Sequence, residues 1–251
     1  MAVTNYILAC DERGTSRWPS NSKTWSLGGF VIDEKNQSEL ITTWTDVKWE
    51  LCGNENVELK WSHFFRGRHQ ERGDNPLIAQ DGDQWRTQAK WALKKIFTST
   101  DLIPIALYVR KDRAAEATFE IKEAGRRILD IDIIWVGILG QFAVFLASER
   151  AIGEVWFDRL GSRKEEERKQ ASWQNLRDGE RPFNPQNQAM LKNIKPELLF
   201  FDSQKEPIIQ IADFVSGIVW AASEGDEEFL LQEIKRYTDN GKRTFRLLNI
   251  Q

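Results

Sequence analysis

Cysteine and histidine are scarce in this sequence. Its thiols are Cys10 and Cys52, and its imidazoles are His63 and His69. These four residues do not have the spacing of a structural zinc site, and two cysteines form no disulfide framework. A low cysteine content is typical of proteins in a reducing compartment, so we expect a cytoplasmic protein.

An excess of charge of either sign is also lacking. Lysine and arginine number 35 against 38 aspartate and glutamate residues, which gives a formal net charge of −3 at pH 7. This balance excludes a polybasic protein. Because particular Lys and Arg side chains neutralise phosphates, any affinity for nucleic acid must come from local basic patches.

Long apolar segments are few as well. The first residues lack the basic and apolar regions of a signal peptide. The most apolar stretch, 131–147, is short for a membrane span and is interrupted by Asp132 and Gln141. We therefore predict that 131–147 is a buried core helix and that the protein has no membrane partner.

The sequence does contain enough apolar residues for a packed core, with 41% hydrophobic residues and 11 tryptophans. Apolar runs bounded by turn residues predict strands at 4–10, 24–33, 102–109, 153–158 and 197–202. Helical spacing predicts helices at 38–52, 83–98, 112–148, 207–222 and 226–237. The first of these is expected to have a cap at Ser38, and the third to have a break near Gly125. A hairpin followed by alternating elements predicts an α/β fold, with a mixed sheet and flanking helices, in a single domain over 1–251. The charged stretch at about 162–195 is interpreted as a helical and loop insertion.

Four carboxylates occupy positions that solubility does not explain. Asp11 and Asp158 end apolar strands, and Glu58 lies between apolar neighbours. Asp213 lies within a helix that is apolar nearly all round, where an unpaired carboxylate is costly and needs a cation or hydrogen bonds. Each also has a purely structural interpretation: an ion pair for Asp213, turn caps for Asp11 and Asp158, and surface exposure for Glu58.

The combination of these carboxylates favours a metal site. Carboxylates at strand ends and on a core helix can converge on one side of a sheet, and Mg²⁺ or Mn²⁺ takes oxygen ligands. Two such ions about 4 Å apart activate a water and stabilise the leaving oxygen of a displacement at phosphorus. We therefore predict a site for Mg²⁺ or Mn²⁺ that cuts phosphodiester bonds.

Several motifs resemble those of a bacterial family called domain of unknown function 3800. DERG at 11–14 looks like its D-E-S-G signature, and ELK at 58–60 is similar to its E-x-K motif. VWFDR at 155–159 fits its strand-end Asp, and FFDSQKEPIIQIADFVSG at 200–217 closely resembles its D-S-x…Q-x-A-D signature. The resemblance implies an RNase H-like fold and a metal-dependent nuclease, with metal ligands at Asp11, Glu58, Asp158 and Asp213.

Further residues are expected to support this site. Lys60, in the matched E-x-K motif, is predicted to be catalytic by neutralising the scissile phosphate or the carboxylates. Glu12, Gln210 and Asp202 are expected beside the metal ligands, and Gln210 shares a helical face with the aspartate three residues later. Ordinary structural contacts are the alternative for Lys60 and Gln210.

Contacts with nucleic acid are predicted for Arg13, Arg66, Arg68 and Trp18. Arg13 stands where the family usually has Ser, and a guanidinium suits a phosphate. Arg66 and Arg68 belong to a basic segment shortly after Glu58, and an exposed Trp18 would stack on a base. The alternatives are a solvated surface for the arginines and packing within its own loop for Trp18.

The sequence thus predicts a metal-dependent nuclease that acts on RNA or DNA. Two alternatives stay open: a metal-dependent phosphohydrolase acting on small nucleotides, and a catalytically inactive nucleic-acid-binding or adaptor module. Cleavage of a long polymer distinguishes the two enzymes, and metal titration separates both from the adaptor.

Overall fold

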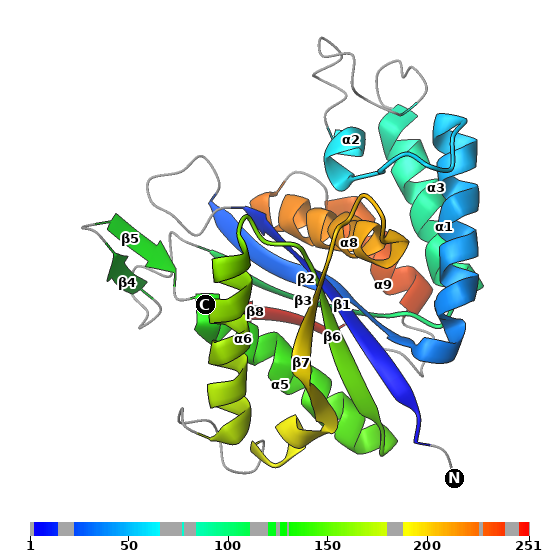
Figure 1. Ribbon diagram of the computed structural model, residues 1–251. Coiled ribbons are helices and arrows are strands. Elements are labelled where there is room, and N and C mark those ends of the chain that lie inside the picture. Colours follow the sequence, from blue (N-terminus) through cyan, green and yellow to red (C-terminus); the bar gives the residue numbers. More distant parts are fainter. Residues whose placement is uncertain are drawn as a thin grey trace.

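A mixed β-sheet forms the centre of the molecule in this computed structural model (Figure 1). The structure describes residues 3–14, 23–65, 77, 84–110, 120–123, 126–129, 131–179, 188–225, 228–238 and 246–250. In this part of the chain the sheet has six strands, in the order β7-β6-β1-β2-β3-β8. Their bounds are β1 (Asn5–Gly14), β2 (Thr24–Asp33), β3 (Ile103–Arg110), β6 (Ile152–Asp158), β7 (Ile194–Phe201) and β8 (Arg246–Ile250).

The pairing directions explain why the sheet is mixed. Strand β2 is antiparallel to both β1 and β3, which confirms the predicted hairpin. Strands β1, β6 and β7 are parallel neighbours, and β8 runs parallel to β3. The predicted α/β fold is confirmed, and the mixed sheet is consistent with an RNase H-like fold. Strand β1 lies in the interior of the sheet, as its apolar sequence requires.

Helices cover both faces of the sheet (Figure 1). Helix α8 (Pro207–Glu224) packs on β1 and β2, and around it lie α1 (Gln37–Cys52), α2 (Trp61–Phe65), α3 (Gln84–Ser99) and α9 (Glu228–Thr238). The opposite face carries α5 (Ile131–Glu149) and α6 (Arg163–Asp178), and short 3-10 helices occupy Glu34–Asn36 and Met190–Asn193. Successive β1 residues alternate between the two cores: Ile7 and Ala9 face the α8 side, and Leu8 and Cys10 face the α5 side.

Helix α8 is buried over most of its length, as its apolar sequence predicts. Pro207 lies in its first turn, and Glu206 caps that turn by accepting the N–H of Ile208 at 3.2 Å. Gly225 ends the helix with a φ of 92°, a conformation that glycine adopts without strain. These signals fix the position of the helix along the sheet.

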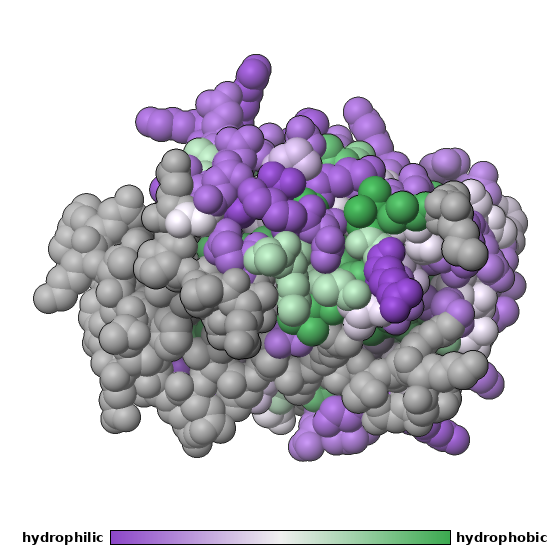
Figure 2. Space-filling model, turned by 90° about the horizontal axis from the view of Figure 1, so that it is seen from below, coloured by the Kyte–Doolittle hydropathy of each residue, from purple (hydrophilic) through white to green (hydrophobic). Residues whose placement is uncertain are grey.

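Helix α5 confirms the predicted core helix at 131–147. Its buried side chains include Ile138, Phe142 and Leu146, which pack against the sheet. None of the helices in the described segments is both long and apolar enough to cross a membrane. On the face seen from below, the described side chains are mainly hydrophilic, with smaller apolar areas between them (Figure 2).

Several predicted elements were wrong. A hairpin of β4 (Glu120–Glu123) and β5 (Arg126–Leu129) replaces part of the helix predicted at 112–148. The sequence EIKE there consists mostly of residues that are common in helices, so the local signal favoured the wrong element. Strand β8 was not predicted at all. Helix α1 begins at Gln37, so Ser38 lies inside it and does not cap it.

The segment predicted as an insertion is part of the sheet's connectivity. Parallel pairing of β6 with β7 requires a crossover connection, and α6 lies within that connection. Its Trp173 and Leu176 are buried in the core under α5. Residues 180–187 of this stretch lie outside the described residues.

Candidate active site

Strands β1 and β6 bring Asp11 and Asp158 to the same end and the same face of the sheet. Ala9 pairs in register with Trp156, and both belong to the core under α8. Each aspartate follows two residues later, so the two-residue repeat of a strand points it to that same face. Asp11 does not end its strand as predicted, because β1 continues to Gly14 in its pairing with β2.

Helix α8 approaches this end of the sheet closely because β2 has a glycine there. Gly28 pairs with Asp11, and a Cβ atom at Gly28 would lie 3.0 Å from the Cα atom of Ser216. This close approach brings Asp213 next to Asp11. Burial, the negative charge of Asp213 and a hydrogen-bonding interaction with its carboxyl group raise the pKa of Asp11 well above its ordinary value.

Asp213 has a defined partner on each carboxylate oxygen. The backbone N–H of Trp61 donates to Oδ2 at 2.7 Å, and Nη2 of Arg13 lies 2.5 Å from Oδ1. Trp61 packs flat against α8 at Gly217, where a Cβ atom would lie 2.0 Å from its ring. The Asp213 side chain is only 6% exposed. The structural interpretation of Asp213, an ion pair with an additional hydrogen bond, is therefore realised.

A second pair of carboxylates is joined by a serine that the sequence analysis did not predict. The hydroxyl of Ser203 donates to Glu58 Oε1 at 2.8 Å. The backbone N–H of Ser203 donates to Asp158 Oδ1 at 3.3 Å. Burial raises the pKa of Asp158, although the N–H of Arg159, the charge of Lys60 and Ser203 act against the increase. Ser203 therefore holds acids from two distant segments together.

Lys60 connects the two pairs of acids electrostatically. Its Nζ lies 2.8 Å from Glu58 Oε1, and its side chain is 35% exposed. Burial lowers the pKa of Lys60, but the hydrogen bond and charge of Glu58 outweigh it, with contributions from Asp158 and Asp213, and raise the pKa overall. Lys60 is thus a charged ammonium group that interacts with three of the four acids, Glu58, Asp158 and Asp213, and solvent reaches it.

Gln210 ties the segments of the site to α8. Its Oε1 accepts the indole N–H of Trp44 at 3.0 Å and the N–H of Leu59 at 3.4 Å. Its Nε2 donates to the carbonyl of Ser203 at 2.6 Å. Because Leu59 separates Glu58 from Lys60, the hydrogen bonds of Gln210 position both of them. The prediction that Gln210 lies beside the site agrees with these contacts.

Glu12 and Asp202 lie apart from the acidic cluster. Glu12 points to the opposite face of the sheet, where it accepts the indole N–H of Trp135 at 3.2 Å and contacts Lys169. Asp202 caps its own turn by accepting the N–H of Gln204 at 3.1 Å. The predicted contact residues Trp18, Arg66 and Arg68 lie outside the described residues.

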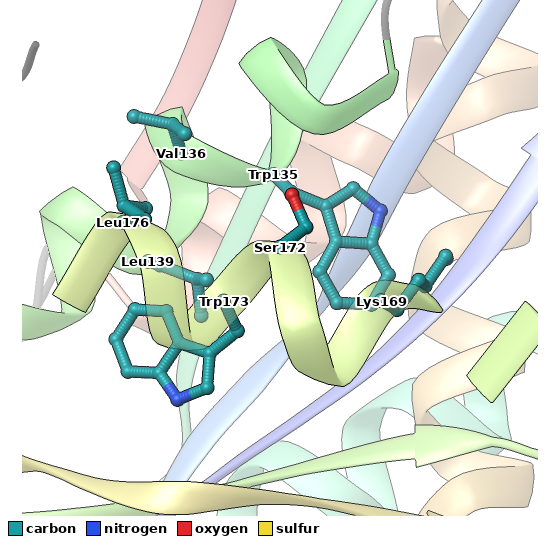
Figure 3. Close-up of a pocket in the computed structure, with 7 residues that line it drawn as sticks. All are labelled: Trp135, Val136, Leu139, Lys169, Ser172, Trp173 and Leu176. Atoms are coloured by element: carbon teal, nitrogen blue, oxygen red, sulfur yellow. The ribbon is translucent and has the colours of Figure 1, made fainter. Parts of the chain in front are cut away.

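The Glu12 side of the sheet contains a small cavity between α5 and α6 (Figure 3). It has a volume of about 20 Å³ and is lined by Trp135, Val136, Leu139, Lys169, Ser172, Trp173 and Leu176. Nζ of Lys169 lies 3.7 Å from the centroid of the Trp135 ring. A space of this size holds about one water molecule and no substrate.

The four carboxylates have the donor chemistry that a hard divalent cation needs. Among the described residues, however, no group of three or more His, Cys, Asp or Glu side chains has the arrangement to hold a metal ion. The chain's own cations lie there instead, Arg13 on Asp213 and Lys60 on Glu58. A bound metal therefore requires these side chains to move.

No family model, no curated protein and no solved structure matches this chain. Membership of the family called domain of unknown function 3800 therefore stays a prediction from the motifs.

Two contacts of the site were missed at the level of sequence. Ser203 belongs to the D-S-x motif at 202–204, but no role in the site was predicted for it. The Trp61 N–H that binds Asp213 is a backbone group, and no side-chain pattern marks it. His63 accepts the N–H of Lys60 through Nδ1 at 3.1 Å, which is an ordinary structural contact.

Proposed function

We propose that this protein is a metal-dependent nuclease that hydrolyses phosphodiester bonds of RNA or DNA. One observation carries the proposal: Asp11, Glu58, Asp158 and Asp213, from four separate segments, interact at one end of the sheet. Structural ion pairing alone does not require so many acids, because among the described residues Arg13 and Lys60 supply two positive charges to the four carboxylates.

The excess of negative charge favours a metal enzyme over a passive nucleic-acid-binding surface. Four carboxylates repel phosphate groups, so a phosphodiester is attracted to this end of the sheet only if an added cation reverses the local charge. Bound Mg²⁺ or Mn²⁺ would supply that charge, together with an activated water. Burial, and after it the negative charge of Asp213, raises the pKa of Asp11, which agrees with this excess of acids.

Each residue has a role in this proposal. Asp11 and Asp213 hold the cation from adjacent elements of the core, and Asp158 and Glu58 complete the set of oxygen ligands. Ser203 fixes the separation of the latter two. Lys60, exposed to solvent, neutralises charge on the phosphate.

The proposal is tested by incubating the protein with labelled RNA, single-stranded DNA, double-stranded DNA and an RNA–DNA hybrid. Mg²⁺ or Mn²⁺ should support cleavage of at least one polymer, and a chelator should stop it. Asp11→Ala should abolish the cleavage, and Asp46→Ala, which changes an exposed acid on α1, should leave it intact. Undiminished cleavage by Asp11→Ala assigns the activity to another site or to a contaminant and overturns the proposal. Hydrolysis of small nucleotides without polymer cleavage favours the phosphohydrolase instead.

A further inference from the structure

Arg13 occupies the carboxylate oxygen that the proposed metal site needs from α8. Its Nη2 lies 2.5 Å from Oδ1 of Asp213, and Oδ2 already accepts the N–H of Trp61. We propose that Arg13 and a divalent cation are alternative partners of Asp213, so that Arg13 lowers the metal affinity of the free protein. This inference rests on the proposed function, since it concerns the same carboxylates.

Simultaneous occupation is unfavourable for a physical reason. Mg²⁺ binds a carboxylate oxygen directly at about 2.0–2.1 Å and tolerates little distortion of its octahedral ligand shell. A guanidinium already in contact with that oxygen would lie within about 5 Å of the ion, where like charges repel strongly in a partly buried site. The two cations therefore compete for Oδ1.

Arg13, and not Asp213, is the partner that can move. Asp213 is fixed on a buried helix and by the Trp61 N–H, and its side chain is 6% exposed. The Arg13 side chain is 26% exposed and approaches from β1, one residue before the end of that strand. A metal ion arriving from solvent therefore meets Arg13 before it meets the Asp213 oxygen.

The contact between the two side chains is not a bidentate pair. Nε and Nη2 of Arg13 are buried and make no hydrogen bond to any described residue. The ion pair is thus held by charge without the two parallel hydrogen bonds that strengthen arginine–carboxylate pairs. The Arg13 guanidinium therefore gives up few hydrogen bonds when it leaves Asp213, so a doubly charged ion can displace it.

The test compares Mn²⁺ affinities, measured by calorimetry at constant ionic strength and without nucleic acid. The variants are Arg13→Ala and Arg13→Gln, the second of which keeps much of the side-chain stem. The matched control is Arg163→Ala, which removes the same charge from a 90% exposed side chain on α6. Circular dichroism verifies that each variant is folded.

We expect Arg13→Ala and Arg13→Gln to bind Mn²⁺ about tenfold more tightly than the wild type, because a competing charge has been removed. Arg163→Ala should bind as the wild type does. Adding Asp213→Asn to Arg13→Gln should abolish the tighter binding. Equal, measurable affinity in wild type and both Arg13 variants overturns this inference and leaves the proposed function standing. Absence of binding in all of them overturns the proposed function as well.

Discussion

The carboxyl groups of Asp11 and Asp213 interact with each other, although both are acids, and the pKa of Asp11 is raised well above its ordinary value. Burial contributes most to this increase, followed by the charge and hydrogen bond of Asp213, with a smaller contribution from Asp158. Arg13 acts in the opposite direction without cancelling it. Ionisation of Asp11 beside Asp213 is therefore unfavourable as long as no additional cation is bound.

The first prediction concerns the pH dependence of stability. Since the folded protein binds the Asp11 proton more tightly than the unfolded chain, the free energy of unfolding should fall as pH rises from about 4 through the raised pKa. Asp11→Asn keeps a hydrogen-bond donor without the titration, so its curve should lack this decrease. Urea denaturation at a series of pH values measures the difference, which should reach about 1–2 kcal/mol near neutral pH. Parallel curves for wild type and Asp11→Asn would contradict the assignment of this pH dependence to Asp11. Asp46→Asn, which changes an exposed acid on α1, serves as the control.

The second prediction compares two variants that each remove one negative charge. Asp11→Asn should stabilise the metal-free protein. Asp213→Asn should destabilise it by about 1–3 kcal/mol. Arg13 then loses its counter-ion, and the Trp61 N–H loses a charged acceptor.

The same variant tests the metal site. Mn²⁺ should raise the melting temperature of the wild type, since it binds the folded state alone. Asp213→Asn should abolish most of that increase. A wild-type melting temperature that is independent of metal argues directly against a metal site.

Much of the fold could be predicted because its signals are local. The alternation of apolar residues in β1 and β2 and the apolar sequence of α8 define a sheet with a helix packed on it. Strand β8 could not be predicted, because its place depends on pairing with the distant strand β3. The β4–β5 hairpin contains residues that are common in helices, so local propensity and the structure disagree there.

The acidic residues of the site could also be predicted, but their pairing could not. A carboxylate in an apolar helix or strand is visible in the sequence, as Asp213 and Asp158 are. Whether its partner is a metal, an arginine or a serine depends on tertiary distances that no spacing encodes. The contact of Arg13 with Asp213, across 200 residues of sequence, is of this kind. Glu12 directly follows Asp11 in a strand, so its side chain had to face the opposite side of the sheet. The prediction that Glu12 lies beside the metal ligands did not use this alternation.

The third prediction concerns Ser203 as a positioning residue. Ser203→Ala removes the hydroxyl that binds Glu58 but keeps the N–H that binds Asp158. We expect a loss of about 1 kcal/mol in the free energy of unfolding and a roughly tenfold lower kcat with little change in KM. Ser38→Ala, an exposed serine in α1, is the matched control. A fall in stability with unchanged kcat indicates a purely structural serine.

The fourth prediction separates the two faces of the sheet. Glu12→Gln removes the carboxylate charge that contacts Lys169, whose side chain is 12% exposed. The free energy of unfolding should decrease by about 1–3 kcal/mol, because a largely buried ammonium loses a charged neighbour. The increase in melting temperature on adding Mn²⁺ should be the same as in the wild type. A metal effect that vanishes in Glu12→Gln places Glu12 in the metal site, contrary to its position in the structure.

The last prediction concerns Lys60 and the binding of nucleic acid. If its solvent-exposed ammonium neutralises a backbone phosphate, Lys60→Ala should weaken binding of a single-stranded oligonucleotide. The slope of the logarithm of affinity against the logarithm of salt concentration should also become shallower by about 0.7, the contribution of one phosphate contact. The measurement uses Ca²⁺, whose loose coordination supports binding with little turnover. Lys164→Ala, an exposed lysine on α6, should leave both quantities unchanged. Asp213→Ala should fail to cut the oligonucleotide when Mg²⁺ replaces Ca²⁺, because a proposed metal ligand has been removed. A Lys60→Ala protein with weaker binding but an unaltered salt slope would show that Lys60 acts through Glu58 and not through a phosphate.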